Sequence, residues 1–147
     1  MREILFRGKT FSSDEWVEGC LLYPVDMFTM ICVPESREKT NFDFMHCTVD
    51  PETVGQFTGL YDKNGKRIFE GDVVRTQPFY DRVYSRKGKT KTHVGVVEHY
   101  IFPEYRSEWR VSIKDYQGFS VCDWSAFYQC EVIGNIHDNP ELLEVTE

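Results

Sequence analysis

VDPETVGQFTGLYDKNGKRIFEGDVV, residues 49–74, is the stretch of this 147-residue chain that decides its fold. Within it, Asn64-Gly65 predicts a type I′ turn, because these two residues readily adopt the positive φ values that such a turn needs. Residues 56–61 and 66–69 are therefore predicted to be the two strands of a tight β-hairpin. Glu70-Gly71-Asp72 predicts a second turn, after which residues 73–75 continue as another strand.

Short helical turns are predicted near residues 50–54 and 139–144. In each segment a capping residue, Asp50 or Asn139, precedes a proline that suits the first helical position because its missing N–H is not needed there. Elsewhere the chain is a series of short apolar runs separated by turn residues. These runs are predicted to be strands at residues 4–6, 16–23, 27–33, 94–101, 109–114, 119–123 and 128–133.

Many short strands with frequent turn signals predict a mainly β fold, built as one or more small barrels of short antiparallel strands. The aromatic content of 15% agrees, since bulky rings pack well on a pleated face. Gly71-Asp72-Val73-Val74 and the later Gly95-Val96-Val97-Glu98 look like the first two strands of an SH3-like barrel. We place that barrel within residues 56–133.

The length of 147 residues predicts a single domain over residues 1–147. The net charge of −7 makes the molecule as a whole repel nucleic acid and acidic membranes. The N-terminus lacks the apolar run of a signal peptide, and no stretch approaches the roughly 20 apolar residues of a membrane span. We therefore expect a cytoplasmic protein that does not associate with membranes.

The cysteines are not spaced as metal ligands, because none of them forms a C-x-x-C pair. We expect reduced thiols rather than a zinc site, and we expect neither a metal nor a cofactor. The histidines are scattered and match no catalytic motif, although a cysteine–histidine pair formed only by the fold stays open. The five cysteines are Cys20, Cys32, Cys47, Cys122 and Cys130.

A basic segment, residues 78–93, is predicted to be a loop inserted between two strands. Its five cations and one acid give a formal charge of +4, which leaves −11 for the rest of the chain. Tyrosines between cations are typical of single-stranded nucleic-acid binding, by stacking and phosphate contact. Contact with a protein partner, or a solvated loop without a dedicated ligand, are the alternatives. The residues of the nucleic-acid hypothesis are Arg82, Arg86, Lys87, Lys89, Lys91, Tyr80 and Tyr84.

Four blocks of the chain resemble the YopX proteins of phages and prophages. They are residues 2–9 (REILFRGK), 16–19 (WVEG), 49–74 and 130–143 (CEVIGNIHDNPELL). The resemblance implies a β-rich fold, a phage or prophage origin and assembly into homo-oligomers. It implies no catalytic residue, because the family has no settled biochemical activity.

Our first hypothesis is therefore a non-enzymatic phage or prophage accessory protein in the host cytoplasm, acting through protein contacts. It would self-associate or bind an unidentified phage or host protein. Exposed aromatic residues would be its anchors, because aromatics dominate interface energetics. The nucleic-acid-binding module is the second hypothesis, and an enzyme with an unrecognised site is the third. The predicted partner-binding residues are Phe79, Phe102, Tyr105 and Trp109, with Tyr80 and Tyr84 beside them.

Overall fold

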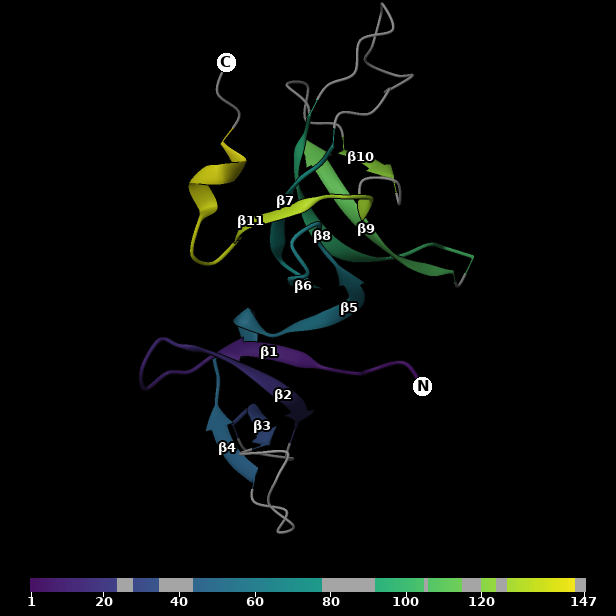
Figure 1. The fold of residues 1–147 in the computed structure, drawn as a ribbon. Helices are drawn as coiled ribbons and strands as arrows, with labels where there is room; N and C mark the ends of the chain where they lie inside the picture. The colour runs from purple at the N-terminus through teal and green to yellow at the C-terminus, as the bar shows by residue number, and fades with distance from the viewer. Residues whose placement is uncertain are drawn as a thin grey trace, which may run out of the picture. The chain divides into compact units, whose positions relative to one another are not determined.

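The computed structural model describes residues 1–23, 28–34, 44–77, 92–104, 106–114, 120–123 and 127–144 (Figure 1). Its elements are β1 (Phe6–Lys9), β2 (Trp16–Leu22), β3 (Met30–Pro34), β4 (Phe44–Thr48), η1 (Pro51–Thr53), β5 (Gly55–Tyr61), β6 (Arg67–Phe69), β7 (Asp72–Arg75), β8 (Val94–Ile101), β9 (Ser107–Lys114), β10 (Ser120–Asp123), β11 (Glu131–Asn135) and η3 (Pro140–Leu143).

The described strands form two antiparallel sheets, with the strand orders β4-β3-β2-β1-β5-β6 and β10-β9-β8-β7-β11. This confirms the prediction of a mainly β fold. The chain divides into two compact units, Met1–Gly59 and Leu60–Glu147, and each unit is described by itself. The single domain over residues 1–147 stays a prediction.

The first unit is a meander in which β1, β2, β3 and β4 are successive antiparallel neighbours. Ile31 and Val49 are fully buried at its centre. Gly8 faces them, and a Cβ at this position would lie 3.0 Å from Cγ2 of Val49 and 3.1 Å from Cδ1 of Ile31. The lack of a side chain at Gly8 therefore lets β1 lie close to this core.

The helical turn η1 is attached to β1 by a side chain. Thr53 Oγ1 accepts a hydrogen bond of 2.8 Å from the backbone N–H of Lys9. Asp50 caps the turn, since its carboxylate accepts the N–H of Glu52 at 3.0 Å. The predicted helical turn near residues 50–54 and its cap are confirmed.

In the second unit, β7 pairs with β8 on one side and with the edge strand β11 on the other. A tight turn leads into β7: Gly71 has a φ of 82°, and the N–H of Phe69 donates to the buried carboxylate of Asp72 at 2.8 Å. The core beside β7 holds Ile68, Val74, Val97, Val111, Ile113 and Cys130, with Trp109, Phe127 and Val132 packed against it.

The turn between β5 and β6 is organised by Asp62. Its Oδ1 accepts the backbone N–H groups of Asn64 at 2.8 Å and Lys66 at 2.9 Å. Its Oδ2 accepts the N–H of Val132 on β11 at 3.0 Å. One buried carboxylate therefore closes a local turn and also holds a strand that lies 70 residues away in sequence.

Burial raises the pKa of the Asp62 carboxyl, but the three N–H groups and the nearby Lys66 ammonium outweigh it. The pKa of Asp62 is therefore lower than that of an ordinary aspartate. Hydrogen bonds to a carboxylate favour its charged form, so the folded state binds its proton less readily than the unfolded chain does.

Several details of the prediction are corrected. Asn64 does not have a positive φ, whereas Gly65 does (78°), so the turn is not type I′. The reason is that Asp62 accepts the N–H groups of both Asn64 and Lys66, which makes a wider turn. The helical turn predicted near residues 139–144 is present, but the Asn139 side chain does not cap it and instead accepts the N–H of Asn135.

Other corrections concern the strands. The SH3-like barrel placed within residues 56–133 is not confirmed, because neither sheet of described strands closes on itself. The last strand begins at Glu131 rather than at residue 128, since residues 127–129 form a turn in which Gln129 has a φ of 52°. The strand β4 was not predicted.

Replacement of Asp62 by asparagine is expected to lower the free energy of unfolding at pH 7 by about 2 kcal/mol, because an amide cannot accept all three N–H groups. The low pKa of Asp62 stabilises the fold above the unfolded-state value of about 3.9, and this contribution is lost as the pH falls through the folded-state value. Urea unfolding of both proteins should therefore show a stability difference that shrinks as the pH falls below the unfolded-state value of about 3.9.

The matched control is Asp14→Asn, at an exposed carboxylate that pairs with Lys9. This change should cost less than about 0.5 kcal/mol at any pH. An Asp62→Asn protein as stable as the wild type at pH 7 would contradict the role given to Asp62.

Candidate interaction surface

Most residues of the predicted sites lie outside the described part of the chain. Of the predicted aromatic anchors, the structure describes Phe102 and Trp109, and both belong to the β8–β9 hairpin. The residues outside the described ranges are Phe79, Tyr80, Arg82, Tyr84, Arg86, Lys87, Lys89, Lys91 and Tyr105.

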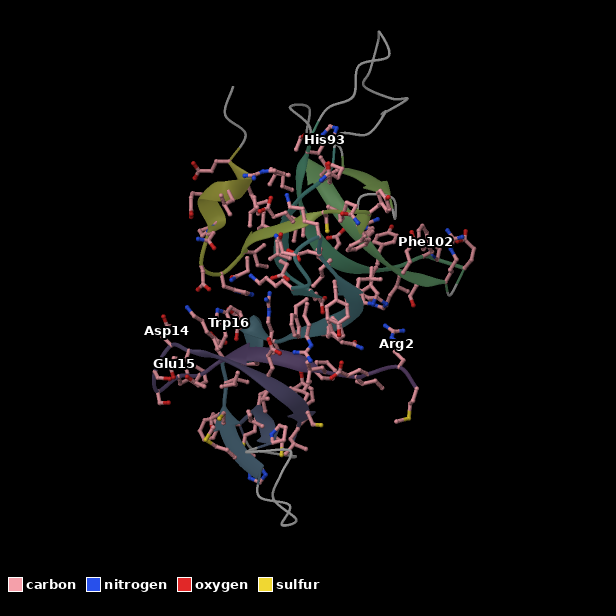
Figure 2. The ribbon with its side chains drawn as sticks, in the orientation of Figure 1. Arg2, Asp14, Glu15, Trp16, His93 and Phe102 are labelled. Carbon is pink, nitrogen blue, oxygen red and sulfur yellow. The ribbon has the colours of Figure 1, made fainter. Side chains whose placement is uncertain are left out.

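The described residues on either side of the basic segment are joined across β7 and β8. The N–H of Thr76 donates to the carbonyl oxygen of His93 at 2.8 Å. The N–H of His93 donates in turn to Thr76 Oγ1 at 3.0 Å. Figure 2 shows His93 at the start of β8, away from the turn that joins β8 to β9. Thr76, which precedes the basic segment, and His93, its last residue, are thus joined by two hydrogen bonds.

The opposite end of the β8–β9 hairpin extends beyond the rest of its sheet (Figure 1). Described pairing of β7 with β8 runs only from Val94 to Val96, and that of β10 with β9 begins at Val111. Between these limits, residues 98–101 pair with residues 107–110 as a two-stranded ribbon, and we call the described residues 98–104 and 106–110 the arm. The arm is closed by a hydrogen bond of 2.7 Å from the N–H of Phe102 to the carbonyl oxygen of Arg106.

One face of the arm carries two aromatic rings that lie between two guanidinium groups. Arg110 lies over the ring of Tyr100, with Cζ 3.5 Å from the ring centroid. The ring of Tyr100 meets that of Phe102 edge-on, with centroids 4.8 Å apart. Arg106 lies over Phe102 at 4.5 Å. These four side chains form a continuous stack, which reaches the distal end of the hairpin at Phe102 (Figure 2).

The stack is anchored toward the body of the sheet by an ion pair. Nε of Arg110 donates to Oε1 of Glu98 at 2.6 Å, and these two residues are directly opposite in the register of β8 and β9. Arg110 is therefore held by a carboxylate on one side and by an aromatic face on the other. The position of Arg110 in the stack is therefore set by contacts within the hairpin itself.

The other face of the arm continues the core. Trp109 is half-buried and packs against the core cluster, and its ring centroid lies 4.8 Å from that of His99. Farther along, the side chain of Ile101 is 68% exposed. Trp109 therefore stabilises the base of the arm, and its assignment as a partner-binding residue stays a prediction.

Four residues of the arm were not predicted to be functional from the sequence, namely Tyr100, Ile101, Arg106 and Arg110. The sequence pattern that could have indicated them is the alternation of side chains between two faces along two strands that are joined by a short loop. It becomes visible only when the register is known, because the register brings Tyr100 beside Arg110 and places both on the face away from the core.

Displaced pKa values occur at three described groups, and structural causes explain each one. For Asp62, burial raises the pKa, but the backbone hydrogen bonds described above outweigh it and lower the pKa. Burial is the main cause that raises the pKa of Cys130, to about 11, with the charge of Asp62 adding to it. Burial and the neighbouring Cys20 raise the pKa of Cys32.

Within the described residues, no group of three or more His, Cys, Asp or Glu side chains is arranged to hold a metal ion. No helix of the described chain combines the length and the apolar character needed to cross a membrane.

Two antiparallel sheets with little helix define a small all-β protein. The chain belongs to the YopX protein family, whose model matches residues 5–144, and the predicted resemblance is confirmed. Its structure is similar to that of protein EF1440 from Enterococcus faecalis, at 23% identity and a TM-score of 0.51, over 98% of this chain and 100% of that one. At this identity the likeness concerns the fold alone. No curated protein matches the chain.

The two described aromatic anchors should respond differently to truncation. Trp109→Ala is expected to lower the free energy of unfolding by about 2–3 kcal/mol, because it removes a ring packed on the core. Phe102→Ala should change it by less than about 0.5 kcal/mol, since that ring stacks on surface groups. Urea unfolding of the two variants would check this, and equal losses would contradict the division of the arm into a core face and a surface face.

Proposed function

We propose that this protein is a non-enzymatic accessory protein of phage or prophage origin that acts in the host cytoplasm through protein–protein contacts, including contacts between its own copies. Membership of the YopX family and the all-β fold support this proposal. The observation that carries it is the arm with its ordered stack of Tyr100, Phe102, Arg106 and Arg110.

The composition of the stack favours contact with protein. Tyrosine and arginine are enriched among the residues that contribute most binding energy at protein interfaces. Ordering a flexible side chain on binding costs about 0.5–1.5 kcal/mol, and the contacts within the stack reduce this cost in advance. The exposed Ile101 on the other face adds apolar area at the same end of the hairpin.

The charges of the arm favour a second copy of this chain as the partner. Cations (Arg106, Arg110) alternate with exposed or half-exposed carboxylates (Glu98, Glu104, Glu108) along one short ribbon. A twofold interface uses the same patch on both subunits, so that patch must be self-complementary. A ribbon with both signs of charge and central aromatic rings meets this requirement.

Binding rather than catalysis is proposed because the described groups with displaced pKa values have structural explanations. Asp62 is occupied by three backbone hydrogen bonds, and Cys130 lies in the core. Neither is arranged as a general acid, a base or a nucleophile beside a second catalytic group.

The double variant Ile101→Ser, Phe102→Ala is expected to convert the oligomer of the wild type to monomer, because both apolar side chains at the end of the arm are removed. Size-exclusion chromatography with light scattering would measure this. The matched control is Tyr128→Ser, which removes another exposed aromatic of the same unit and should leave the oligomer intact.

A monomeric wild type would contradict self-association. An oligomer that survives the double variant would contradict the arm as its interface. In both cases circular dichroism would first confirm that the variants keep the β-sheet spectrum.

Binding of nucleic acid by residues 78–93 is the second candidate function, favoured by their formal charge of +4 and by the hydrogen bonds that fix Thr76 and His93. If all five cations contact phosphates, the affinity for single-stranded DNA should fall about 100-fold between about 50 and 200 mM salt. Replacing the five cations by serine should abolish binding and its salt dependence.

A matched double variant, Tyr80→Ala with Tyr84→Ala, tests whether bases stack on these two rings. It should weaken binding of single-stranded DNA but not of duplex DNA, since paired bases do not present free faces. Absence of binding by the wild type at low salt would rule out this function.

A further inference from the structure

The first unit contains two thiols that face each other across neighbouring strands. Cys20 on β2 is the direct cross-strand partner of Cys32 on β3. Side chains directly opposite in an antiparallel pair lie on the same face, with Cβ atoms about 4.5–5.5 Å apart. A disulfide needs a Cβ separation of about 3.5–4.5 Å, so a small approach of the two strands suffices.

The backbone beside this pair is already closely packed. A Cβ at Gly19 would overlap the carbonyl oxygen of Cys32. Any larger residue at this position would therefore push β2 away from β3. Gly19 keeps the two strands close at the point where the thiols face each other.

The pair is accessible from solvent. Cys20 is exposed, Cys32 is half-buried, and both are free thiols. Burial raises the pKa of Cys32, and the neighbouring Cys20 raises it further, which also places the two thiols within electrostatic reach. Cys20 is thus the more accessible thiol of the pair.

Neither Cys47 nor Cys130 competes for these thiols. Cys47 is opposite Ile31, so it lies on the other face of the sheet from Cys32, and Cys130 is buried in the core of the second unit. The cross-strand partner of Cys32 on its other side is His46.

We propose that Cys20 and Cys32 are a reversible redox-modification site at which a hydroperoxide closes a disulfide between β2 and β3. This site is independent of the arm and goes beyond the proposed function. A thiol pair of this kind in a reducing compartment is typical of redox sensing, because disulfides there are transient.

The reaction balances with hydrogen peroxide as the oxidant. The Cys20 thiolate attacks one peroxide oxygen, the O–O bond breaks, and an S–O bond forms while hydroxide leaves and takes up a proton. The Cys32 thiolate then attacks the Cys20 sulfur, so an S–S bond forms, the S–O bond breaks, and the second oxygen leaves as water. The two sulfurs lose two electrons, and a thiol reductant reverses the reaction.

The test treats the reduced full chain with hydrogen peroxide, blocks the remaining thiols by alkylation, and maps the peptides by mass spectrometry. The expected result is one linked peptide pair containing Cys20 and Cys32, lighter by two hydrogens than the reduced pair and separated again by dithiothreitol. In Cys32→Ser the reaction should stop at a sulfenic acid on Cys20, which dimedone traps. Cys47→Ser is the matched control and should still form the link.

A second measurement needs no variant. Phenylarsine oxide bridges two neighbouring thiols, so it should protect Cys20 and Cys32 together from alkylation while leaving Cys47 reactive. Oxidation of Cys20 without a link to Cys32, or alkylation of both thiols at an unchanged rate in the presence of the arsenical, would overturn the proposal.

Discussion

The carboxylate of Asp62 carries the connections on which the second unit depends. It accepts two N–H groups of the β5–β6 turn and one N–H of β11, a strand distant in sequence. The adjacent Lys63 repeats the connection, since its N–H donates to the carbonyl oxygen of Cys130 and its ammonium pairs with Glu131 at 2.9 Å. A local turn and a long-range strand contact are thereby made by the same few atoms, so forming one favours the other.

The arm depends on this arrangement indirectly, through the pairing of neighbouring strands. β11 pairs with β7, β7 pairs with β8, and the buried Val97 and Val111 join the base of the arm to the core. Beyond those residues the described pairing leaves the ribbon without a third strand, and its order comes from side-chain stacking and the Glu98–Arg110 pair. A rigid base and a stacked surface are together what a binding hairpin needs, because a loose ribbon would lose more entropy on binding.

What the sequence predicted correctly rests on local chemistry. The hairpin from residue 56 to 69, the turn before Asp72 and the helical turn capped by Asp50 each follow from residues close together in the chain. β4 was missed because Phe44-Met45-His46-Cys47-Thr48 has neither a turn signal nor a clear apolar alternation. Its pairing with β3 comes from the tertiary fold. The barrel was wrongly inferred because sheet closure is a global property that strand spacing does not determine.

Register explains why the sequence predicted neither the thiol pair nor the residues of the stack other than Phe102. Cys20 and Cys32 are twelve positions apart in sequence and carry no motif, yet they are direct cross-strand partners. Tyr100 and Arg110 are ten positions apart, yet their side chains are in contact on one face of the sheet. Shifting either strand by one residue would move one member of each pair to the opposite face. The thiol pair and the stack are therefore products of strand alignment, and that alignment is set by buried positions such as Ile31 and Val97. Core packing in this protein thus determines which surface side chains meet.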